Sequence, residues 1–515
     1  MSQSELSHIK VKLVKSKLDP AKSKEFFEDC SIKREQFQLR KCKVAIFGAG
    51  ITGLSCAKEL VENGQDVTVF EAEDRIGGRA QSTTIGNKKT GKHIVEKGGE
   101  LIDESYSTVR GLSRELGVEM RDNYLPGQTH CNFGFRVDGK HISRTELVAA
   151  IAPFVEMLSE HKKILDSGTK QSKVLREELN KLTCTEYFES VNPAMPEWAV
   201  KTLKSHIGGE WGPSDVQGAL IFIEYMGYEE FTSENPNLGD EGFARYTFKN
   251  GTNEFTSKLA DRVLNNIYED QGSGRIFFNT EVVAVSEVKD GIEVTTKCGN
   301  EVKTEVFEYA VGTIPTHLYK KIDISGLNLP PSRLDAINSV EFGTDGKGVV
   351  LTRNSVGPDP SCSTIMRDDF MGSAGDNWRT NRNNIPGEEW VPREQYLGEA
   401  DVNIEVAGGR RNLMKAIRSD MDEQFAGGDH SGPAALFTWH DKRPGGAYAS
   451  WGAGELDRLA EGLMIHHPED PKGFYMAGDT QSMSHNGYME GAARGGQTAA
   501  SHIIGDIVLK DARLK

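Results

Sequence analysis

The clearest pattern of apolar and polar positions lies between residues 43 and 71. Lys43–Phe47 is a short run of mostly apolar, β-branched-rich residues, which is typical of a buried strand. A second apolar run, Val67–Phe70, ends at Glu71. Between them, apolar residues recur at helical spacing up to Gly64, at Leu54, Ala57, Leu60 and Val61. The pattern predicts a strand, a turn, a helix and a second strand.

Beyond this unit, strand-like and helical patterns follow one another. Residues 105–232 read as amphipathic helices whose apolar stripes form a core, and residues 233–242 as a loop. Period-two alternation in Arg275–Thr296, with a Lys-Asp-Gly turn, predicts a meander. Further expectations are strands in His93–Asp103, Glu305–Pro315 and Phe474–Ala477, a strand pair in Val340–Arg353, a loop-rich stretch in Asp359–Gly409, a helix in NLMKAIRSDMDEQF and a small-residue helix from Met489.

The turn after the first strand has the spacing G-x-G-x-x-G, at Gly48, Gly50 and Gly53. In dinucleotide-binding folds the first glycine permits a tight turn, the second lets the backbone approach a pyrophosphate, and the third lets the helix pack on the strand. The amino end of the helix attracts phosphate, and Glu71 stands where an acid accepts hydrogen bonds from a ribose. A plain turn is the alternative, since the chain has 55 glycines. The context favours a dinucleotide, NAD or FAD.

Composition narrows the class of protein. The chain has 515 residues, 37% of them hydrophobic and 27% charged, which fits a globular protein of about two to four domains. Its formal charge of −15 argues against nucleic acid or an anionic membrane as a main partner. Because no apolar run is long enough to span a membrane and no signal-peptide core is present, we expect a cytoplasmic protein. Seven scattered cysteines without a C-x-x-C pair favour free thiols.

Two shorter motifs do not carry chemistry. Gly86–His93 imitates a P-loop but has His93 where Ser or Thr should hold magnesium, and it does not open a helix. His466 and His467 lie beside acids, but a surface loop explains them better than a metal site. The sequence also lacks G-x-S-x-G and H-E-x-x-H, which argues against a hydrolase or a metalloenzyme.

Several motifs in order resemble the flavin-containing amine oxidase family, which includes monoamine, polyamine and L-amino-acid oxidases. They are Glu71 followed by DRIGGR, then EKGGELID, VGTIP, TWHDKRPGGAY and YMAGDTQSMSHNGYMEGA. The resemblance implies FAD and an α/β fold, in which a Rossmann-like, glutathione-reductase-like FAD-binding domain carries an inserted mixed α+β substrate domain. The implied domains are an N-terminal helical extension (1–40, or a disordered tail), the FAD-binding domain (41–110, 240–325 and 435–510) and the substrate-binding domain (111–239 and 326–434).

The resemblance also assigns cofactor contacts. Asp479 would hold the pyrophosphate or ribityl region, and Met489 would present its backbone N–H to the flavin from a helix amino end, whose dipole stabilises the charge gained on reduction. Ala447 stands where monoamine oxidases with covalent flavin have cysteine, so we expect non-covalent FAD. The implied cofactor-binding residues are Gly48, Gly50, Gly53, Glu71, Gly78, Arg79, Gly99, Glu100, Val282, Trp439, Asp479 and Met489, with a plain core role as the alternative for Trp439.

Three residues resemble the catalytic set of the family. Lys347 matches the lysine that holds a water beside the flavin, with a solvated turn lysine as the alternative. Tyr448 and Tyr488 match the two rings that flank the amine. The implied reaction is hydride transfer from an amine carbon to flavin, hydrolysis of the imine to a carbonyl compound and ammonia, and reoxidation by O2 to hydrogen peroxide.

The substrate is then a small amino acid or amine, and a broad L-amino-acid oxidase is the preferred interpretation. Such a substrate needs a cation for its carboxylate. Glu100 and Leu101 occupy the positions where animal and venom amino-acid oxidases have arginine. This departure either favours simple amines or means that the cation comes from the inserted domain, at Arg121, Arg136 or Arg245. An amine oxidase, an amino-acid 2-monooxygenase and a non-enzymatic flavin-binding protein are the alternatives. A homodimer is an open expectation.

Overall fold

The computed structural model describes residues 39–124, 132–137, 140–211, 214–227, 244–265, 272–353, 363–367, 376–380, 389–397, 408–424, 429–439, 445–482 and 485–514. The chain divides into two compact units, residues 42–503 and a small unit of residues 1–41 with 504–515. In the small unit, the Arg40 backbone N–H donates to the Asp511 carboxylate at 3.0 Å. Apart from residues 39 and 40, the predicted N-terminal extension lies outside the described residues.

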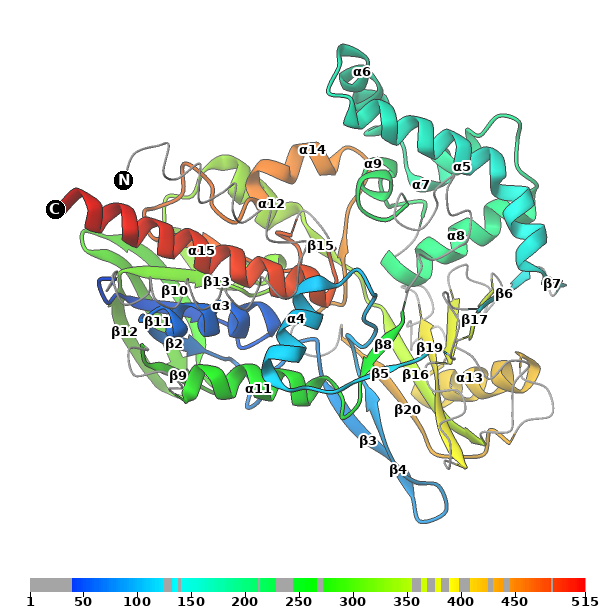
Figure 1. Ribbon diagram of the computed structural model, residues 1–515, viewed down its shortest axis with the longest axis horizontal. Coiled ribbons are helices and arrows are strands. Elements are labelled where there is room, and N and C mark those ends of the chain that lie inside the picture. Colours follow the sequence, from blue (N-terminus) through cyan, green and yellow to red (C-terminus); the bar gives the residue numbers. More distant parts are fainter. Residues whose placement is uncertain are drawn as a thin grey trace, which may run out of the picture. The chain divides into compact units, whose positions relative to one another are not determined.

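A parallel five-stranded sheet in the order β22-β13-β1-β2-β9 contains the predicted strand–helix–strand unit (Figure 1). β1 (Lys43–Phe47) and β2 (Asp66–Phe70) confirm the two predicted strands, and α3 (Ile51–Glu62) connects them. Because neighbouring strands come from distant parts of the sequence, their carboxyl ends bring distant loops to one edge. The other strands are β9 (Gly274–Phe277), β13 (Tyr309–Gly312) and β22 (Phe474–Met476).

Two helices pack around α3. The predicted small-residue helix is α15 (Met489–Leu514), and a Cβ at Gly496 would lie only 2.3 Å from the Thr52 carbonyl oxygen. Glycine at this point therefore lets α15 approach the α3 backbone. On another side of α3 lies α11 (Thr252–Leu264), which also packs against β9.

The predicted meander forms a four-stranded sheet in the order β12-β11-β10-β14. Gly291, with φ +147°, makes the turn between its first two strands. The single strand expected over Glu305–Pro315 is wrong, because the chain leaves this sheet at Phe307 and enters the parallel sheet at Tyr309. One apolar run thus serves two sheets. The strands are β10 (Glu281–Val288), β11 (Gly291–Cys298), β12 (Glu301–Phe307) and β14 (Asp323–Gly326).

A seven-stranded sheet corrects several expectations. It has the order β20-β16-β19-β18-β17-β6-β7, so three of its strands come from the stretch expected to be loop-rich and two from the stretch expected to be helical. β6 pairs with β17, and β16 pairs with β19 and β20, so part of this sheet joins strands that are not consecutive in the sequence, which local patterns do not reveal. Its strands are β6 (Asn132–Val137), β7 (Lys140–Ile142), β16 (Gly346–Arg353), β17 (Ser363–Arg367), β18 (Asp376–Thr380), β19 (Trp390–Leu397) and β20 (Ala434–Thr438).

The predicted strand pair in Val340–Arg353 is also wrong. β15 (Glu341–Phe342) pairs with β21 (Ala449–Ser450), whereas β16 pairs with β19 and β20. The predicted helix α13 (Arg410–Gln424) is confirmed and covers one face of β16, since a Cβ at Gly348 would meet Ile417 at 2.7 Å. The opposite face of β16 is the one that carries Lys347.

Helices between residues 144 and 227 form an apolar core, as the sequence predicted. Ser143 and Thr183 begin two of them with capping boxes that satisfy free backbone N–H groups. The predicted loop at 233–242 lies outside the described residues. These helices are α5 (Arg144–Asp166), α6 (Lys170–Leu179), α7 (Cys184–Glu189), α8 (Glu197–Trp211), α9 (Ala219–Ile221) and η2 (Phe222–Gly227).

Shorter elements connect these layers. The predicted strand over His93–Asp103 ends early, since β4 stops at Glu96 and Gly98–Gly99 follow as an irregular segment. The remaining elements are β3 (Ser82–Asn87), β4 (Gly91–Glu96), α4 (Ser107–Leu116), β5 (Met120–Asp122), β8 (Tyr246–Phe248), η3 (Thr316–Lys321), α12 (Pro331–Ser339), α14 (Glu455–Ala460) and η4 (Glu461–Leu463).

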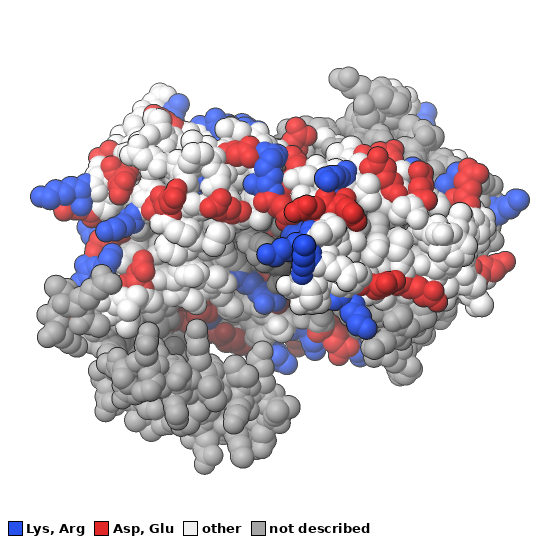
Figure 2. All heavy atoms as spheres, turned by 90° about the horizontal axis from the view of Figure 1, so that it is seen from above, with Lys and Arg blue, Asp and Glu red and all other residues white. Residues whose placement is uncertain are grey.

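The surface carries charges of both signs. Figure 2 shows acidic and basic side chains interspersed over the described part of one face. Within the described ranges, none of the helices is both long and apolar enough to cross a membrane.

Candidate functional site

A large pocket opens at the carboxyl ends of the parallel strands. Its walls include Gly48 after β1, Glu71 after β2, Thr313 after β13 and Asp479 after β22. Crevices at this edge of an open parallel sheet are the usual ligand sites of such folds. All the candidate site residues line this pocket except Gly53, which packs against Gly48.

The glycine turn has the three geometries that the fingerprint requires. Gly48 has φ +103°, a conformation that L side chains rarely adopt. A Cβ at Gly53 would lie 2.0 Å from the Gly48 carbonyl oxygen, so this glycine permits helix and strand to touch. A Cβ at Gly50 would meet no described atom within 4 Å, although Gly50 lines the pocket. Gly50 therefore leaves its space to a ligand.

Glu71 is buried beside this turn. Its Oε2 accepts a hydrogen bond from the Ala49 N–H at 2.7 Å, and its Oε1 accepts one from the Glu73 N–H at 2.8 Å. Burial raises the pKa of Glu71, against the lowering effect of these two hydrogen bonds. The carboxylate is thus held in one orientation at the edge of the pocket. Val282 lines the same end of the pocket together with Thr280.

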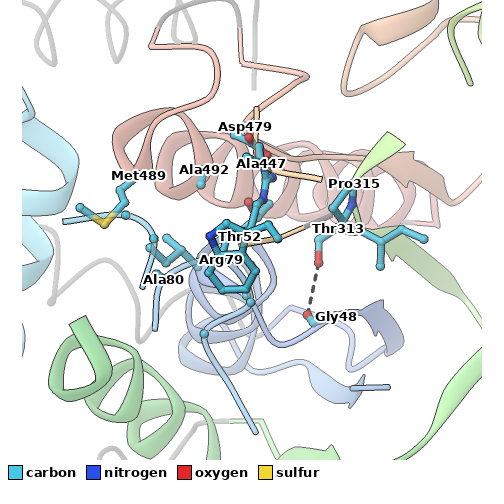
Figure 3. A pocket seen from close by; sticks show the side chains of 18 of the residues that line it. Gly48, Thr52, Arg79, Ala80, Thr313, Pro315, Ala447, Asp479, Met489 and Ala492 are labelled. Atoms are coloured by element: carbon cyan, nitrogen blue, oxygen red, sulfur yellow. Dashed lines mark hydrogen bonds and ion pairs between the residues drawn. The ribbon is translucent and has the colours of Figure 1, made fainter. Parts of the chain in front are cut away.

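Arg79 links three distant parts of the chain. Its guanidinium pairs with the Asp479 carboxylate at 2.5 Å and donates to the Ala447 carbonyl oxygen at 2.5 Å. Figure 3 shows Arg79 lying across the pocket toward both residues. The Asp479 Oδ2 atom is buried and has no hydrogen-bond partner among the described residues. This leaves a buried acceptor at the pocket for a ligand hydroxyl or N–H.

The amino end of α15 reaches the pocket at Met489. A Cβ at Gly99 would lie 3.1 Å from Met489 Cγ, so the two predicted residues are neighbours. Glu490, the next residue, is buried and accepts hydrogen bonds from the Thr108 and Val109 N–H groups at the start of α4. Sequence reasoning missed Glu490, although an acid beside the amino end of another helix is a known stabilising arrangement.

Lys347 lies inside the wall of the pocket in a cluster of titratable groups. Its ammonium donates to Glu100 Oε2 at 2.7 Å and to the Gly98 carbonyl oxygen at 3.3 Å, and Glu394 Oε2 lies 3.3 Å away. Burial alone would lower the pKa of Lys347, but Glu100 and Glu394 outweigh it, so its pKa lies well above the ordinary lysine value. The alternative of a solvated turn lysine is wrong, because only 3% of the side chain is exposed.

Two members of this cluster were not predicted. Glu394 and Tyr396, whose ring centroid lies 4.7 Å from Lys347 Nζ, belong to β19. That strand falls in the stretch expected to be loop, so no local signal pointed to them. Glu100, expected at the cofactor, directs its carboxylate to Lys347.

Both candidate tyrosines line the pocket, and the residue before Tyr488, Gly487, lies beside the ring of Tyr448. The Tyr448 carbonyl accepts from the Gly343 N–H at 2.8 Å, and a Cβ at Gly487 would lie 3.3 Å from Tyr448 Cδ1. Tyr488 faces the ring of Tyr106, with ring centroids 6.2 Å apart. The pocket-lining Tyr106 was not predicted.

Trp439 has both a pocket and a packing role. Its ring lines the pocket, its Nε1 donates to the Lys97 carbonyl oxygen at 3.2 Å, and its Cζ2 would lie 2.9 Å from a Cβ at Gly98. Gly98 therefore lets the indole approach the segment that also carries Gly99.

Of the three arginines considered for a substrate carboxylate, the two with described side chains, Arg121 and Arg245, do not line the pocket. Arg245 pairs with Asp122 at 2.9 Å and with Glu104 at 2.7 Å. Arg121 lies on β5, and the side chain of Arg136 lies outside the described residues. Within the described chain, Arg79 is the only arginine that lines the pocket.

Cysteines and histidines show no further reactive centre in the part of the chain that is described. Cys42, Cys56, Cys184 and Cys298 are free, as predicted, whereas Cys30, Cys131 and Cys362 lie outside the described residues. Burial raises the pKa values of the Cys56 and Cys184 thiols. The described residues contain no group of side chains that could hold a metal ion, and the ring of His466 packs against Tyr475.

Comparisons with known proteins agree with this site. Residues 51–504 match the model of the flavin-containing amine oxidoreductase family. The chain is 23% identical over 523 residues to amine oxidase [flavin-containing] B of Sus scrofa, covering 90% of this chain and 86% of the relative. An amine oxidase [flavin-containing] of Danio rerio is 22% identical over 486 residues, with 90% and 85% covered.

Solved structures share the fold. Cyclohexylamine oxidase from Brevibacterium oxydans has a TM-score of 0.72 at 19% identity, covering 91% of this chain and all of that chain. Putrescine oxidase bound to putrescine has a TM-score of 0.70 at 16% identity, with 90% and 99% covered. The architecture is therefore the α/β FAD-binding fold of flavin amine oxidases, as expected from the sequence. The chain belongs to the flavin-containing amine oxidoreductase family, and it is an FAD-dependent oxidoreductase that acts on amines.

Proposed function

We propose that the protein oxidises small primary amines that lack an α-carboxylate, with non-covalent FAD and with O2 as the electron acceptor that yields hydrogen peroxide. The carrying observation is the cluster at Lys347, where two buried carboxylates lie within 3.3 Å of one ammonium. Carboxylates at the pocket wall favour a cationic amine over a substrate that carries a carboxylate of its own. The arginine that lines the described pocket, Arg79, already pairs with Asp479.

The residues at the pocket fit FAD. Gly50 leaves room at the amino end of α3 for the pyrophosphate, and Glu71 presents a fixed carboxylate for the ribose. The buried Asp479 Oδ2 offers an acceptor for a hydroxyl of the ribityl chain. Ala447, immediately before Tyr448, has no thiol for a covalent bond. When bound, FAD supplies the two-electron acceptor for hydride from the amine carbon.

The protein contributes positioning and exclusion of water. Tyr448 and Tyr488 form two aromatic walls that orient the amine, and the contact of Gly487 with Tyr448 fixes their spacing. The amino end of α15 directs its dipole at the site from Met489. Lys347 supplies a fixed ammonium in the wall. The product imine hydrolyses to a carbonyl compound and ammonia.

Matched pairs of substrates test the proposal. Phenylethylamine is compared with L-phenylalanine, and cadaverine with L-lysine, since each pair differs by one carboxylate. The purified yellow protein is mixed anaerobically with each compound, loss of flavin absorbance is followed, and peroxide is measured after air is admitted.

We expect amines to bleach the flavin and their carboxylated partners to do so much more slowly. Faster bleaching by the amino acids would overturn the proposal in favour of the L-amino-acid oxidase expected from the sequence, which stays a prediction. Bleaching without peroxide would favour a monooxygenase. Protein that binds FAD and is bleached by none of these compounds would point to another substrate class.

A further inference from the structure

Tyr106 has a place at the pocket that none of the roles assigned so far explains. It lines the pocket and immediately precedes α4, with only 4% of its surface exposed. Its ring lies against that of Tyr488, with centroids 6.2 Å apart and planes inclined by 54°. Aromatic rings at this separation attract one another beyond the effect of their burial. Tyr106 thus continues the aromatic wall that Tyr488 begins.

His485 also packs against the ring of Tyr106. The two rings meet edge to face, with centroids 5.1 Å apart and planes at 88°. Both ring nitrogens of His485 are buried and make no hydrogen bond within the described chain. Burial lowers the pKa of His485, so the imidazole is uncharged at neutral pH and serves as a packing surface. Tyr106 therefore contacts two rings of one segment and has little freedom to turn away from the pocket.

The backbone that carries Tyr106 is fixed as well. Its N–H donates to the Asp103 carbonyl oxygen at 3.1 Å. The buried carboxylate of Glu490 accepts hydrogen bonds from the Thr108 and Val109 N–H groups, each at 2.9 Å. This carboxylate ties the start of α4 to the amino end of α15, which lie side by side in Figure 1. A wall that is fixed before the ligand arrives binds it at a lower cost in conformational entropy.

We infer that Tyr106 is a specificity-determining residue, whose ring limits the size of the carbon skeleton of an amine that binds between Tyr448 and Tyr488. The inference rests on the proposed function, in which those two tyrosines flank the amine. Because the ring of Tyr106 is packed against Tyr488 and His485, it excludes a ligand that needs its space. An apolar pocket discriminates by size in steps of about 10- to 200-fold for each methylene group.

Two amines that cannot be oxidised measure this size limit directly. Cumylamine and its naphthyl counterpart have no hydrogen on the carbon that bears the nitrogen, so neither can give up a hydride. They differ by one fused aromatic ring. Each is titrated into the yellow protein by isothermal titration calorimetry, and the ratio of the two Kd values reports the space available beyond the amine.

The variant Tyr106→Ala removes the ring. We expect the Kd of the naphthyl amine to fall at least about tenfold relative to that of cumylamine, because the second aromatic ring gains the space that Tyr106 occupied. Tyr106→Phe keeps the ring and should leave the ratio of the two Kd values unchanged. Both variants should keep their FAD.

Tyr246→Ala is the matched control. Tyr246 is half-buried on β8, and its backbone exchanges hydrogen bonds of 2.8 and 2.9 Å with that of Ile102, so it lies in the same part of the molecule as Tyr106. Its ring packs against the guanidinium groups of Arg110 and Arg245 and does not line the pocket. The ratio of the two Kd values should therefore stay at the wild-type value.

The possible outcomes separate the inference from the proposed function. An unchanged ratio in Tyr106→Ala, or an equal change in Tyr246→Ala, would overturn the inference and leave the proposed function in place. A yellow wild-type protein that bound neither amine would refute the proposed function, and the inference would fall with it. If Tyr106→Ala does not fold or loses FAD, Tyr106→Leu, which keeps a smaller apolar side chain, decides the inference by the same ratio.

Discussion

Replacing Gly50 and Gly53 by alanine should impair the protein for two different reasons, although both stand in the same turn. At Gly53 the new Cβ would lie 2.0 Å from the Gly48 carbonyl oxygen and 2.8 Å from Thr313 Oγ1. At Gly50 it would meet no described atom, and the backbone there, with φ −74°, suits any residue. Gly53→Ala therefore disturbs the packing of the protein itself, whereas Gly50→Ala mainly fills the space left for the ligand.

The expected magnitudes follow from these contacts. Gly53→Ala overpacks a buried turn against a backbone oxygen that no rotamer can move, which costs about 1–3 kcal/mol of unfolding free energy. Gly50→Ala loses a favourable helix-capping residue, worth roughly 1 kcal/mol or less. It also reduces the entropy of the unfolded chain, which offsets about 0.4–1 kcal/mol. The methyl group added in Gly50→Ala should, however, weaken the affinity for FAD at least about tenfold, which is about 1.4 kcal/mol of binding free energy.

The assay uses protein from which FAD has been removed. Denaturant unfolding of each apoprotein gives the stability change, and FAD titration followed by flavin fluorescence gives the affinity. We expect Gly53→Ala to destabilise the apoprotein and Gly50→Ala to leave it near the wild type while losing FAD affinity. The reasoning would be refuted if Gly50→Ala destabilised the apoprotein as much as Gly53→Ala, or bound FAD as tightly as the wild type.

Two further predictions concern buried charge. Arg333 is fully buried, pairs with the Asp470 carboxylate and donates to the Gly462 and Met464 carbonyl oxygens. Arg333→Met should cost about 3–5 kcal/mol of unfolding free energy, because it leaves the buried Asp470 carboxylate unpaired. The control Arg458→Met changes an exposed arginine and should cost about 0–1 kcal/mol. Equal losses of unfolding free energy in the two variants, measured by denaturant unfolding, would contradict this prediction. Burial lowers the pKa of His485, so the unfolded chain binds its proton more readily and stability should fall as pH drops through about 6.5. His485→Asn, which suits its φ of +56°, should reduce that dependence, and an unchanged pH profile of unfolding free energy would argue against it.

Local patterns predicted those elements whose chemistry depends on near neighbours. The strands at Lys43–Phe47 and Val67–Phe70 and the helix between them are confirmed, because a buried βαβ unit has a strong local signal. The pocket also brings together Lys347, Tyr448 and Tyr488, although their roles there stay predictions. The division into domains likewise stays a prediction.

Long-range pairing was beyond those patterns. The strands at Ser363–Arg367 and Trp390–Leu397 were expected to be loop. Each pairs on one side with a strand that is not its neighbour in the sequence, β6 or β16, and such a strand need not carry a clean alternation of its own. For the same reason, Glu394 and Tyr396 on β19 were not predicted as site residues. The apolar run from Glu305 to Pro315 was predicted as one strand, because its pattern does not show that it belongs to two sheets.

By itself, the sequence determined the cofactor-binding turn, since Gly48, Gly50, Gly53 and Glu71 act within one short unit whose geometry depends on local backbone freedom. Only the tertiary structure decided the electrostatics of the reactive end. Lys347, Glu100 and Glu394 come from three separate segments. The register of β16 with β19 and the end of β4 bring the two carboxylates within 3.3 Å of Lys347 Nζ. The interaction energy of two charges depends on their distance and on their burial, and both quantities are set by the tertiary structure.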